Sequence, residues 1–255
     1  AAAYAFSKYF SHLIVLPITP NVLSVCLIVA ITIVHLFKKS IGANFQIMIT
    51  VGKILLMILF IAVGGYFANG HGVTNNLVVG DFSKELFSAS FWISLIYVSY
   101  AYSGWNATAY MIDEIENPKV NVPKSIVWGT MVVMILYVLI NYVFLLAAPA
   151  DAMRGKEDVA FVVADFIFSK NGALLIGGLI SFFLISTISS MVVVGPRVIS
   201  RIANDFPELN YLSKFSKNDI PVRAIITQSI LSILILLMAD FFGETDFLQI
   251  RSRLK

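Results

Sequence analysis

Long apolar runs separated by short polar segments make up almost the whole chain. A helix needs about 20 apolar residues to cross the hydrocarbon core of a bilayer. The segments that satisfy this criterion, together with the end of a further span at the N-terminus, are about 1–16, 21–37, 44–68, 86–117, 123–148, 172–203 and 221–243. The short links between them favour antiparallel neighbours. The pattern therefore predicts an all-α, multi-pass membrane helical bundle.

Three segments fall outside this simple pattern. The stretch 157–170, "EDVAFVVADFIFSK", is amphipathic and too short to span, so it is predicted to be a helix at the outer interface; the alternative is an N-terminal extension of the span at 172–203. The tail 244–255 is interpreted as truncated or atypical. The N-terminus lacks the charged region and cleavage site of a signal peptide, so we expect the sequence to be an internal fragment.

Composition narrows the class of protein. The chain is 58% hydrophobic and 13% charged, with a mean hydropathy of +0.86 and a net charge of +3. Soluble domains average roughly a quarter charged residues, so a lipid bilayer is the expected surrounding. No basic stripe with interleaved aromatics suggests nucleic acid as a partner. The one cysteine, Cys26, allows neither a disulfide framework nor a cysteine metal site within the chain.

Charge distribution predicts the orientation. Lys and Arg are more frequent in one set of alternate loops, which includes Lys38, Lys119 and Arg201, than in the other. By the positive-inside rule this side is cytoplasmic, and the expected location is the plasma or inner membrane of the cell.

The stretch "SYAYSGWNATAYMIDEIENPKVNVPKS", residues 99–125, interrupts an apolar segment with Ser103 and Gly104. Irregular backbone at membrane depth survives only beside protein or a water-filled cavity. Glycine tolerates non-helical dihedral angles, and discontinuous helices at the bilayer midplane are a common device of secondary transporters. A broken helix frees carbonyls for an ammonium group and exposes a helix N-terminus to a carboxylate. The alternative is a glycine that serves only helix packing.

The same stretch resembles the sixth helix and following loop of the amino acid–polyamine–organocation (APC) superfamily of amino acid permeases. "TVGKILLMILFIAVG" is similar to the fifth helix of that family, and "GPRVISRIANDFPEL" to the end of its eighth. The resemblance implies a partial leucine-transporter-like inverted-repeat fold with a broken sixth helix, running from late helix 3 to about helix 9. It further implies a secondary active transporter of amino acids that works by alternating access, in which helices 1 and 6 hold the substrate; helix 1 is not in this sequence.

The resemblance also implies which residues bind the amino acid. Tyr100 would close over the substrate, and the carbonyls of Tyr100, Ala101 and Ser103 would face its amino group. Ser103 and Gly104 would form the unwound turn, and Asn106 would be a polar neighbour of the substrate. Trp105 would pack the start of the second half-helix, and Tyr102 is either a pocket residue or an interhelical packing residue. The expected substrate-binding residues are Tyr100, Ala101, Tyr102, Ser103, Gly104, Trp105 and Asn106.

Lys53 is the charged residue predicted to lie deepest in a span. If its helix starts near residue 44, Lys53 is roughly 14 Å into the bilayer, where an ammonium costs about 2.5–3.5 kcal/mol. In sodium-independent relatives a lysine here replaces a bound sodium ion and contacts hydroxyls of helix 8. The resemblance therefore implies sodium-independent transport, coupled to protons or working by exchange, with coupling residues Lys53, Ser186, Thr187, Ser189 and Ser190. The alternatives are a snorkelling or purely structural lysine and hydroxyls that bond their own helix.

An intramembrane enzyme and an amino acid sensor are the alternatives to a transporter. An intramembrane enzyme would need a His or Asp facing a serine across helices, and His12, His35 and His71 are expected at span ends or in an outer loop. A transport-inactive amino acid sensor on the same fold remains the alternative function. No cofactor or metal is expected. A partner subunit is not expected either, because Cys26 is predicted to lie inside a helix, whereas partner-bound members of the family use a cysteine in a loop.

Overall fold

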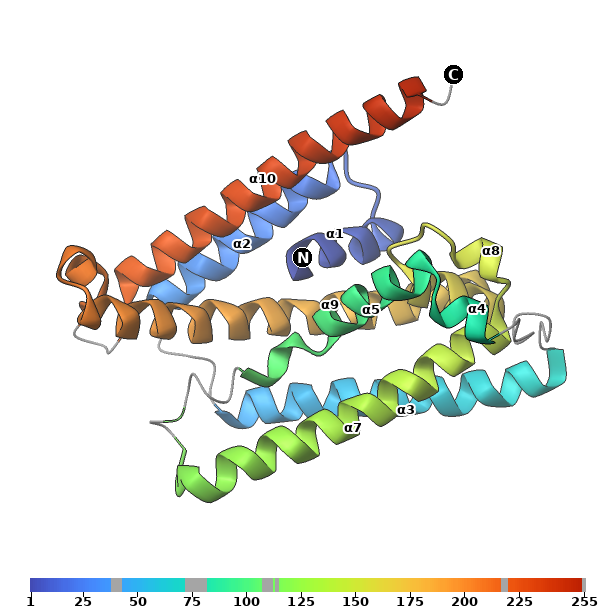
Figure 1. Cartoon of the computed structure of the whole chain (residues 1–255), viewed down its shortest axis with the longest axis horizontal. Coiled ribbons are helices and arrows are strands. Elements are labelled where there is room, and N and C mark those ends of the chain that lie inside the picture. The colour runs from blue at the N-terminus through green and yellow to red at the C-terminus, as the bar shows by residue number, and fades with distance from the viewer. Residues whose placement is uncertain (38–42, 72–81, 107–111, 113–114, 217–219, 254–255) are drawn as a thin grey trace. The chain divides into compact units, whose positions relative to one another are not determined.

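The structure is a computed structural model that describes residues 1–37, 43–71, 82–106, 112, 115–216 and 220–253. Its elements, in chain order, are α1 (Ala2–Leu13), α2 (Pro20–Phe37), α3 (Ala43–His71), α4 (Phe82–Leu86), α5 (Ala89–Ala101), η2 (Ser103–Asn106), α7 (Pro118–Ala147), α8 (Ala150–Met153), α9 (Val159–Asp205), η4 (Pro207–Leu212) and α10 (Val222–Arg253) (Figure 1). No strand occurs among the described residues. The predicted all-α helical class is confirmed.

The chain forms two compact units. The first consists of Ala1–Gly52 and Lys170–Lys255, and the second of Lys53–Ser169. In the first unit, α2 packs against α1 and α10, and Figure 1 shows α10 lying alongside α2. Its core is apolar and draws on α1, α2, α9 and α10, with the buried residues Ala3, Phe6, Ile28, Ile31, Ile188, Val192, Ile220 and Ile225.

In the second unit, Phe60 of α3 packs against two other aromatic rings. Its ring lies edge to face with Phe144 of α7, at a centroid distance of 5.8 Å, and with Phe168, at 6.1 Å. One turn further along α3, Gly64 lets the helix approach Val143 of α7 and Ile167 closely. The C-terminal part of α3, the C-terminal half of α7 and the first turns of α9 therefore pack together.

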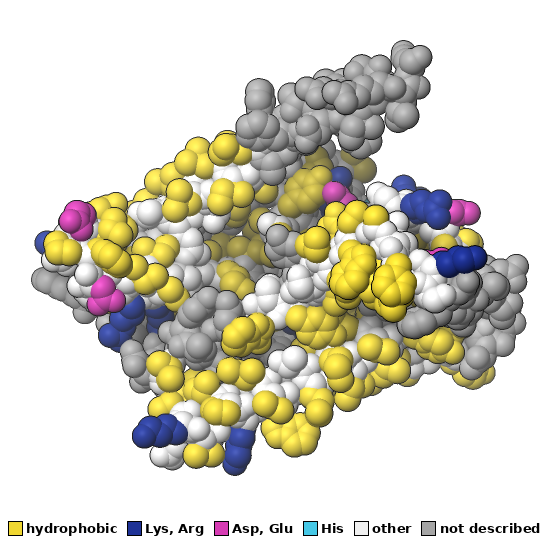
Figure 2. Space-filling view, in the orientation of Figure 1, with side chains coloured by type: hydrophobic (Ala, Val, Ile, Leu, Met, Phe, Trp, Pro, Cys, Tyr) yellow, Lys and Arg dark blue, Asp and Glu magenta, His cyan; other side chains and the backbone are white. Residues whose placement is uncertain are grey.

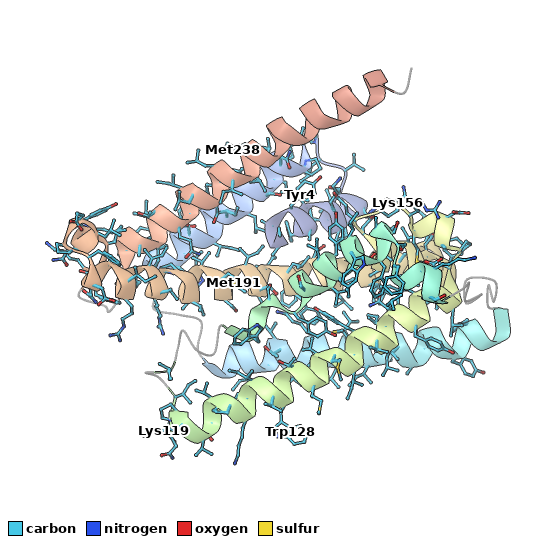
Figure 3. All side chains as sticks on the ribbon, in the orientation of Figure 1. Tyr4, Lys119, Trp128, Lys156, Met191 and Met238 are labelled. Carbon is cyan, nitrogen blue, oxygen red and sulfur yellow. The ribbon has the colours of Figure 1, made fainter. Side chains whose placement is uncertain are left out.

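Among the described residues, four helices are long and apolar enough to cross a membrane. They are Pro20–Phe37, Ile47–Ala68, Pro118–Ala147 and Val159–Asp205, and Val222–Met238 is a shorter apolar helix. Figure 2 shows hydrophobic side chains over the exposed surfaces of the long helices, with Lys and Arg gathered toward helix ends. Trp128 points outward from α7 and is 66% exposed (Figure 3). Apolar surface of this extent belongs in lipid or against further helices, as in a multi-pass membrane protein.

Local sequence explains where two of the long helices begin. Pro20 opens α2 directly after Thr19, whose hydroxyl accepts a hydrogen bond from the Val22 amide at 3.4 Å. Pro118 opens α7 after Asn117, which has a left-handed φ of 47°. Proline suits the first helical position because the N–H it lacks would have no partner there.

Ser169 interrupts α9 with φ 60° and ψ 177°, a conformation that is not helical. The residues before it belong to the second unit, and those after it to the first. Within the predicted stretch 157–170, the helix begins at Val159 and is interrupted at Ser169. Its location at the outer interface stays a prediction.

Candidate functional site

The α-helix α5 ends at Ala101, within the motif that interrupts the apolar segment. The amide of Tyr102 donates to the carbonyl of Ser99 at 3.3 Å, which is a turn with i to i+3 spacing. The backbone then continues as the short 3₁₀ helix η2, Ser103–Asn106. A 3₁₀ turn inside an apolar segment changes which carbonyls are bonded and is a frequent mark of a functional hinge. The α-helix therefore ends where the sequence predicted an interruption, while residues 107–111 and 113–114 of the expected second half-helix lie outside the described residues.

Gly104 lies within this 3₁₀ turn. Gly104 does not have a positive φ, because the 3₁₀ conformation uses negative φ angles that any residue can adopt. A Cβ built on Gly104 would meet no atom within 4 Å. The glycine therefore leaves open space beside the turn and does not supply an unusual dihedral angle. Ser103 and Trp105 next to it are exposed, Trp105 to 56%.

Tyr102 connects the break to α7. Its ring lies edge to face with Tyr137, with centroids 5.4 Å apart and an interplanar angle of 66°. Both side chains are half-buried. Such a pair contributes about 0.5–1.5 kcal/mol beyond the area it buries. Of the two readings of Tyr102, this contact supports interhelical packing.

For the remaining predicted substrate-binding residues, the structure describes the backbone but not every side chain. Ala101 is the last residue of α5 and is exposed. Tyr100 lies in α5 and Asn106 ends η2, but both side chains are outside the described residues. Residues 107–111, against which Trp105 was expected to pack, are also outside them.

Lys53 lies in the interior of α3 and is half-buried. It belongs to the second unit, whereas the four predicted hydroxyls of α9 belong to the first. The pairing of Lys53 with these hydroxyls therefore stays a prediction.

The hydroxyls themselves have defined partners. Thr187 donates to the carbonyl of Phe183 at 3.2 Å, and Ser190 donates to that of Ser186 at 2.9 Å. These are back-bonds to their own helix, as the alternative reading expected. Ser186 is buried.

Ser189 is bonded across helices, because its Oγ lies 2.8 Å from Nε2 of His35 in α2. Both side chains are buried, His35 at 5% and Ser189 at 6% exposed. His35 lies in the last turn of α2, at the end of a span as expected, and its contact with a serine of another helix was not foreseen from the sequence. The available signal was the i, i+3 spacing of Thr32 and His35, which puts two polar side chains on one face of an otherwise apolar helix.

A His that faces a Ser was the feature expected of an enzyme, so its chemistry has to be considered. Nucleophilic activation requires a base that is itself oriented by a third group, usually a carboxylate. Neither α2 nor the stretch 173–195 of α9 contains an acidic residue. The pair is also buried among apolar side chains of the first unit, including Ile31 and Val192. The arrangement therefore suits a structural hydrogen bond rather than a reaction with substrate.

No cluster of three or more His, Cys, Asp or Glu residues that could hold a metal ion is found in the described parts of the chain. Cys26 lies within α2, as predicted, and is exposed.

Comparison with known proteins finds sequences that are similar to this chain. The family profile described as amino acid permease matches residues 1–250. The b(0,+)-type amino acid transporter 1 of Oryctolagus cuniculus is 27% identical over 150 residues, which are 57% of this chain and 31% of the relative. Amino acid transporter protein 6 of Caenorhabditis elegans is 24% identical over 234 residues, 89% of this chain and 43% of the relative. The serine/threonine exchanger SteT of Bacillus subtilis (strain 168) is 21% identical over 179 residues, 70% of this chain and 40% of the relative. The chain thus spans less than half the length of each of these three relatives.

Proposed function

Because this chain belongs to the amino acid permease family, we propose that it is part of a secondary transporter that moves amino acids across a cell membrane by alternating access. The observation that carries the proposal is the break in the α-helix at Ala101, followed by the 3₁₀ turn Ser103–Asn106. The relatives that match are named as amino acid transporters or as an exchanger of serine and threonine. The plasma or inner membrane is the proposed location.

The chemistry of the break suits a zwitterion. Backbone carbonyls at the end of α5, from Tyr100 and Ala101, and at the start of η2, from Ser103, would accept hydrogen bonds from the substrate ammonium group. The open space beside Gly104 would admit the substrate side chain. Exposed Trp105 and the side chains of Tyr100 and Asn106 would complete this half of the pocket. Helix 1 of the family fold, outside this sequence, would supply the other half.

The proposed coupling is independent of sodium. An ammonium inside a membrane helix is expensive unless it has a function, and half-buried Lys53 is a candidate for a proton carrier or for a fixed cation in place of an ion. The proposed hydroxyl partners of this coupling site are Ser186, Thr187, Ser189 and Ser190 of α9. Exchange of one amino acid for another is equally compatible with a fixed charge at Lys53.

The test is uptake by the native full-length protein in proteoliposomes, with each labelled standard L-amino acid supplied with and without sodium and with and without an internal amino acid. Gly104→Leu should reduce uptake by at least tenfold, since its side chain would fill the space beside the break. Gly129→Leu on α7 is the matched control, because a Cβ at Gly129 also meets no atom within 4 Å. Equal uptake by both variants would contradict the proposed site. Binding of amino acids without uptake or exchange would instead identify a sensor.

A further inference from the structure

Three hydrogen bonds join α2, α9 and α10 pairwise in the first unit. His35 of α2 bonds Ser189 of α9 at 2.8 Å, and Thr32 of α2 bonds Ser229 of α10 at 2.7 Å. The third bond joins α10 to α9, where Nε2 of Gln228 donates to the carbonyl of Met191 at 3.1 Å. Met191 lies midway along the ribbon of α9 in Figure 3. Polar contacts of this kind position membrane helices relative to one another.

The parts of α9 and α10 that bond α2 carry no ionisable side chain, whereas α1, which also packs on α2, carries Tyr4, Lys8, Tyr9 and His12. The stretches of α9 from Ala173 to Gly195 and of α10 from Ala224 to Met238 contain no ionisable residue. On α2 the other titratable side chain is Cys26, two to three turns away and exposed. Because a buried polar group without a partner is costly, the imidazole and the hydroxyl constrain one another.

Two neighbouring serines of α9 have different hydrogen-bond partners. Ser189 and Ser190 are adjacent, so their side chains leave the helix about 100° apart. Ser189 is directed to α2, whereas Ser190 bonds the backbone of its own helix. Both were expected to take part in coupling, and the helix geometry does not give them the same surroundings.

We propose that His35 is a positioning residue that holds the Ser189 hydroxyl toward α2 and withdraws it from the coupling site of the transporter. Coupling along α9 then depends on Ser186, Thr187 and Ser190, and Ser189 acts with His35 to fix α9 against α2. The inference rests on the proposed transport function, but the His35–Ser189 pair itself does not.

The experiment is a double-mutant cycle in the native full-length protein. His35→Leu and Ser189→Ala should each lower the maximal rate of uptake about fivefold, the equivalent of one lost hydrogen bond, and Ser189→Ala should leave KM and the pH dependence of uptake unchanged. The double variant should be no worse than either single variant. His35→Gln, whose amide nitrogen can approach the position of Nε2, should restore most of the rate. Ser190→Ala should instead change KM or the pH dependence.

Ser181→Ala is the matched control, since Ser181 is a buried serine of α9 that bonds the carbonyl of Gly177 in its own helix; it should behave as wild type. Additive effects of His35→Leu and Ser189→Ala would overturn the inference, as would a change of KM or pH dependence in Ser189→Ala that His35→Leu does not share. If the wild-type protein shows no uptake, the proposed function fails. Thermal unfolding of the same variants then tests the His35–Ser189 hydrogen bond. For the assignment of His35 to stand, the double variant must lose less unfolding temperature than the two single variants lose in sum.

Discussion

The side-chain amide of Gln228 in α10 lies directly over the backbone of Gly195 in α9. A Cβ built on Gly195 would come within 2.7 Å of Cδ of Gln228, closer than real contacts allow. The glycine is therefore what permits the Gln228 amide to reach the carbonyl of Met191. Pro196 follows directly, is fully buried and lacks the N–H that would bond the carbonyl of Val192; the bond from α10 reaches the carbonyl one residue earlier, that of Met191.

Gly195→Ala should destabilise the protein by about 1 kcal/mol, because the amide of Gln228 must leave its acceptor. In a Gln228→Ala background the same change should be neutral or stabilising by up to about 1 kcal/mol, since alanine is the better helix former. Thermal unfolding of the four variants in detergent measures the difference. Equal effects of Gly195→Ala in both backgrounds would show that the amide does not constrain this position.

Two adjacent glycines of α3 should respond in opposite directions to alanine. A Cβ at Gly64 would lie 2.6 Å from Cγ1 of Val143 and 3.2 Å from Cδ1 of Ile167, whereas a Cβ at Gly65 meets no atom within 4 Å. Val143 is 2% exposed and has little room to move. Gly64→Ala should therefore cost about 1–3 kcal/mol from overpacking, and Gly65→Ala should gain up to about 1 kcal/mol. Thermal unfolding that ranks Gly65→Ala as the less stable variant would contradict the packing of α3 on α7.

The edge-to-face contact of Tyr102 and Tyr137 should fix the end of α5 against α7. Tyr137→Phe keeps the aromatic ring and should change stability and uptake little, while Tyr137→Ala should cost about 0.5–1.5 kcal/mol for the ring pair in addition to the area it exposes. Because Tyr102 adjoins the break, Tyr137→Ala should also raise the KM for the amino acid. Tyr142→Ala, on the same helix and 51% exposed, is the control. An unchanged KM in Tyr137→Ala would indicate that the contact does not shape the site.

Ser169 should be strained. Its φ of 60° and ψ of 177° lie in a region that glycine adopts almost alone and that costs other residues about 1–3 kcal/mol. Ser169→Gly should therefore raise the unfolding temperature. Asn117, with φ 47° and ψ 58°, is the comparison, since asparagine accepts the left-handed helical region readily and Asn117→Gly should change stability little. A destabilised Ser169→Gly variant would show that the backbone break is not under strain.

Lys53 should be required for transport if its charge serves coupling. Lys53→Gln should reduce uptake by at least tenfold or remove its pH dependence, while Lys119→Gln, an exposed residue in the first turn of α7, should leave both unchanged. Proteoliposome uptake between pH 5 and pH 8 measures the effect. Wild-type uptake and pH dependence in Lys53→Gln would reduce Lys53 to a structural role.

Much of the fold followed from the sequence because lipid leaves a long apolar segment few choices. With every backbone group to be bonded internally, such a segment must be a helix, and the predicted helical class and family are confirmed. The position of the interruption was also predictable. The stretch 99–125, which contains Ser103 and Gly104, matches the motif of the family over its whole length. The chemistry at the break, however, depends on side chains from other helices, and the substrate and coupling residues stay predictions.

The sequence by itself determined that this protein is helical, built for a membrane, interrupted near Gly104 and a member of a family of amino acid permeases. Only the tertiary structure decided that Gly104 provides space rather than a special dihedral angle, that Gly64 and Gly195 are the glycines in close contact, and that Ser189 rather than Ser190 is bonded to His35. The reason is physical. Periodicity along one chain specifies which residues share a face of a helix, but the partner of that face is chosen by packing between segments far apart in sequence.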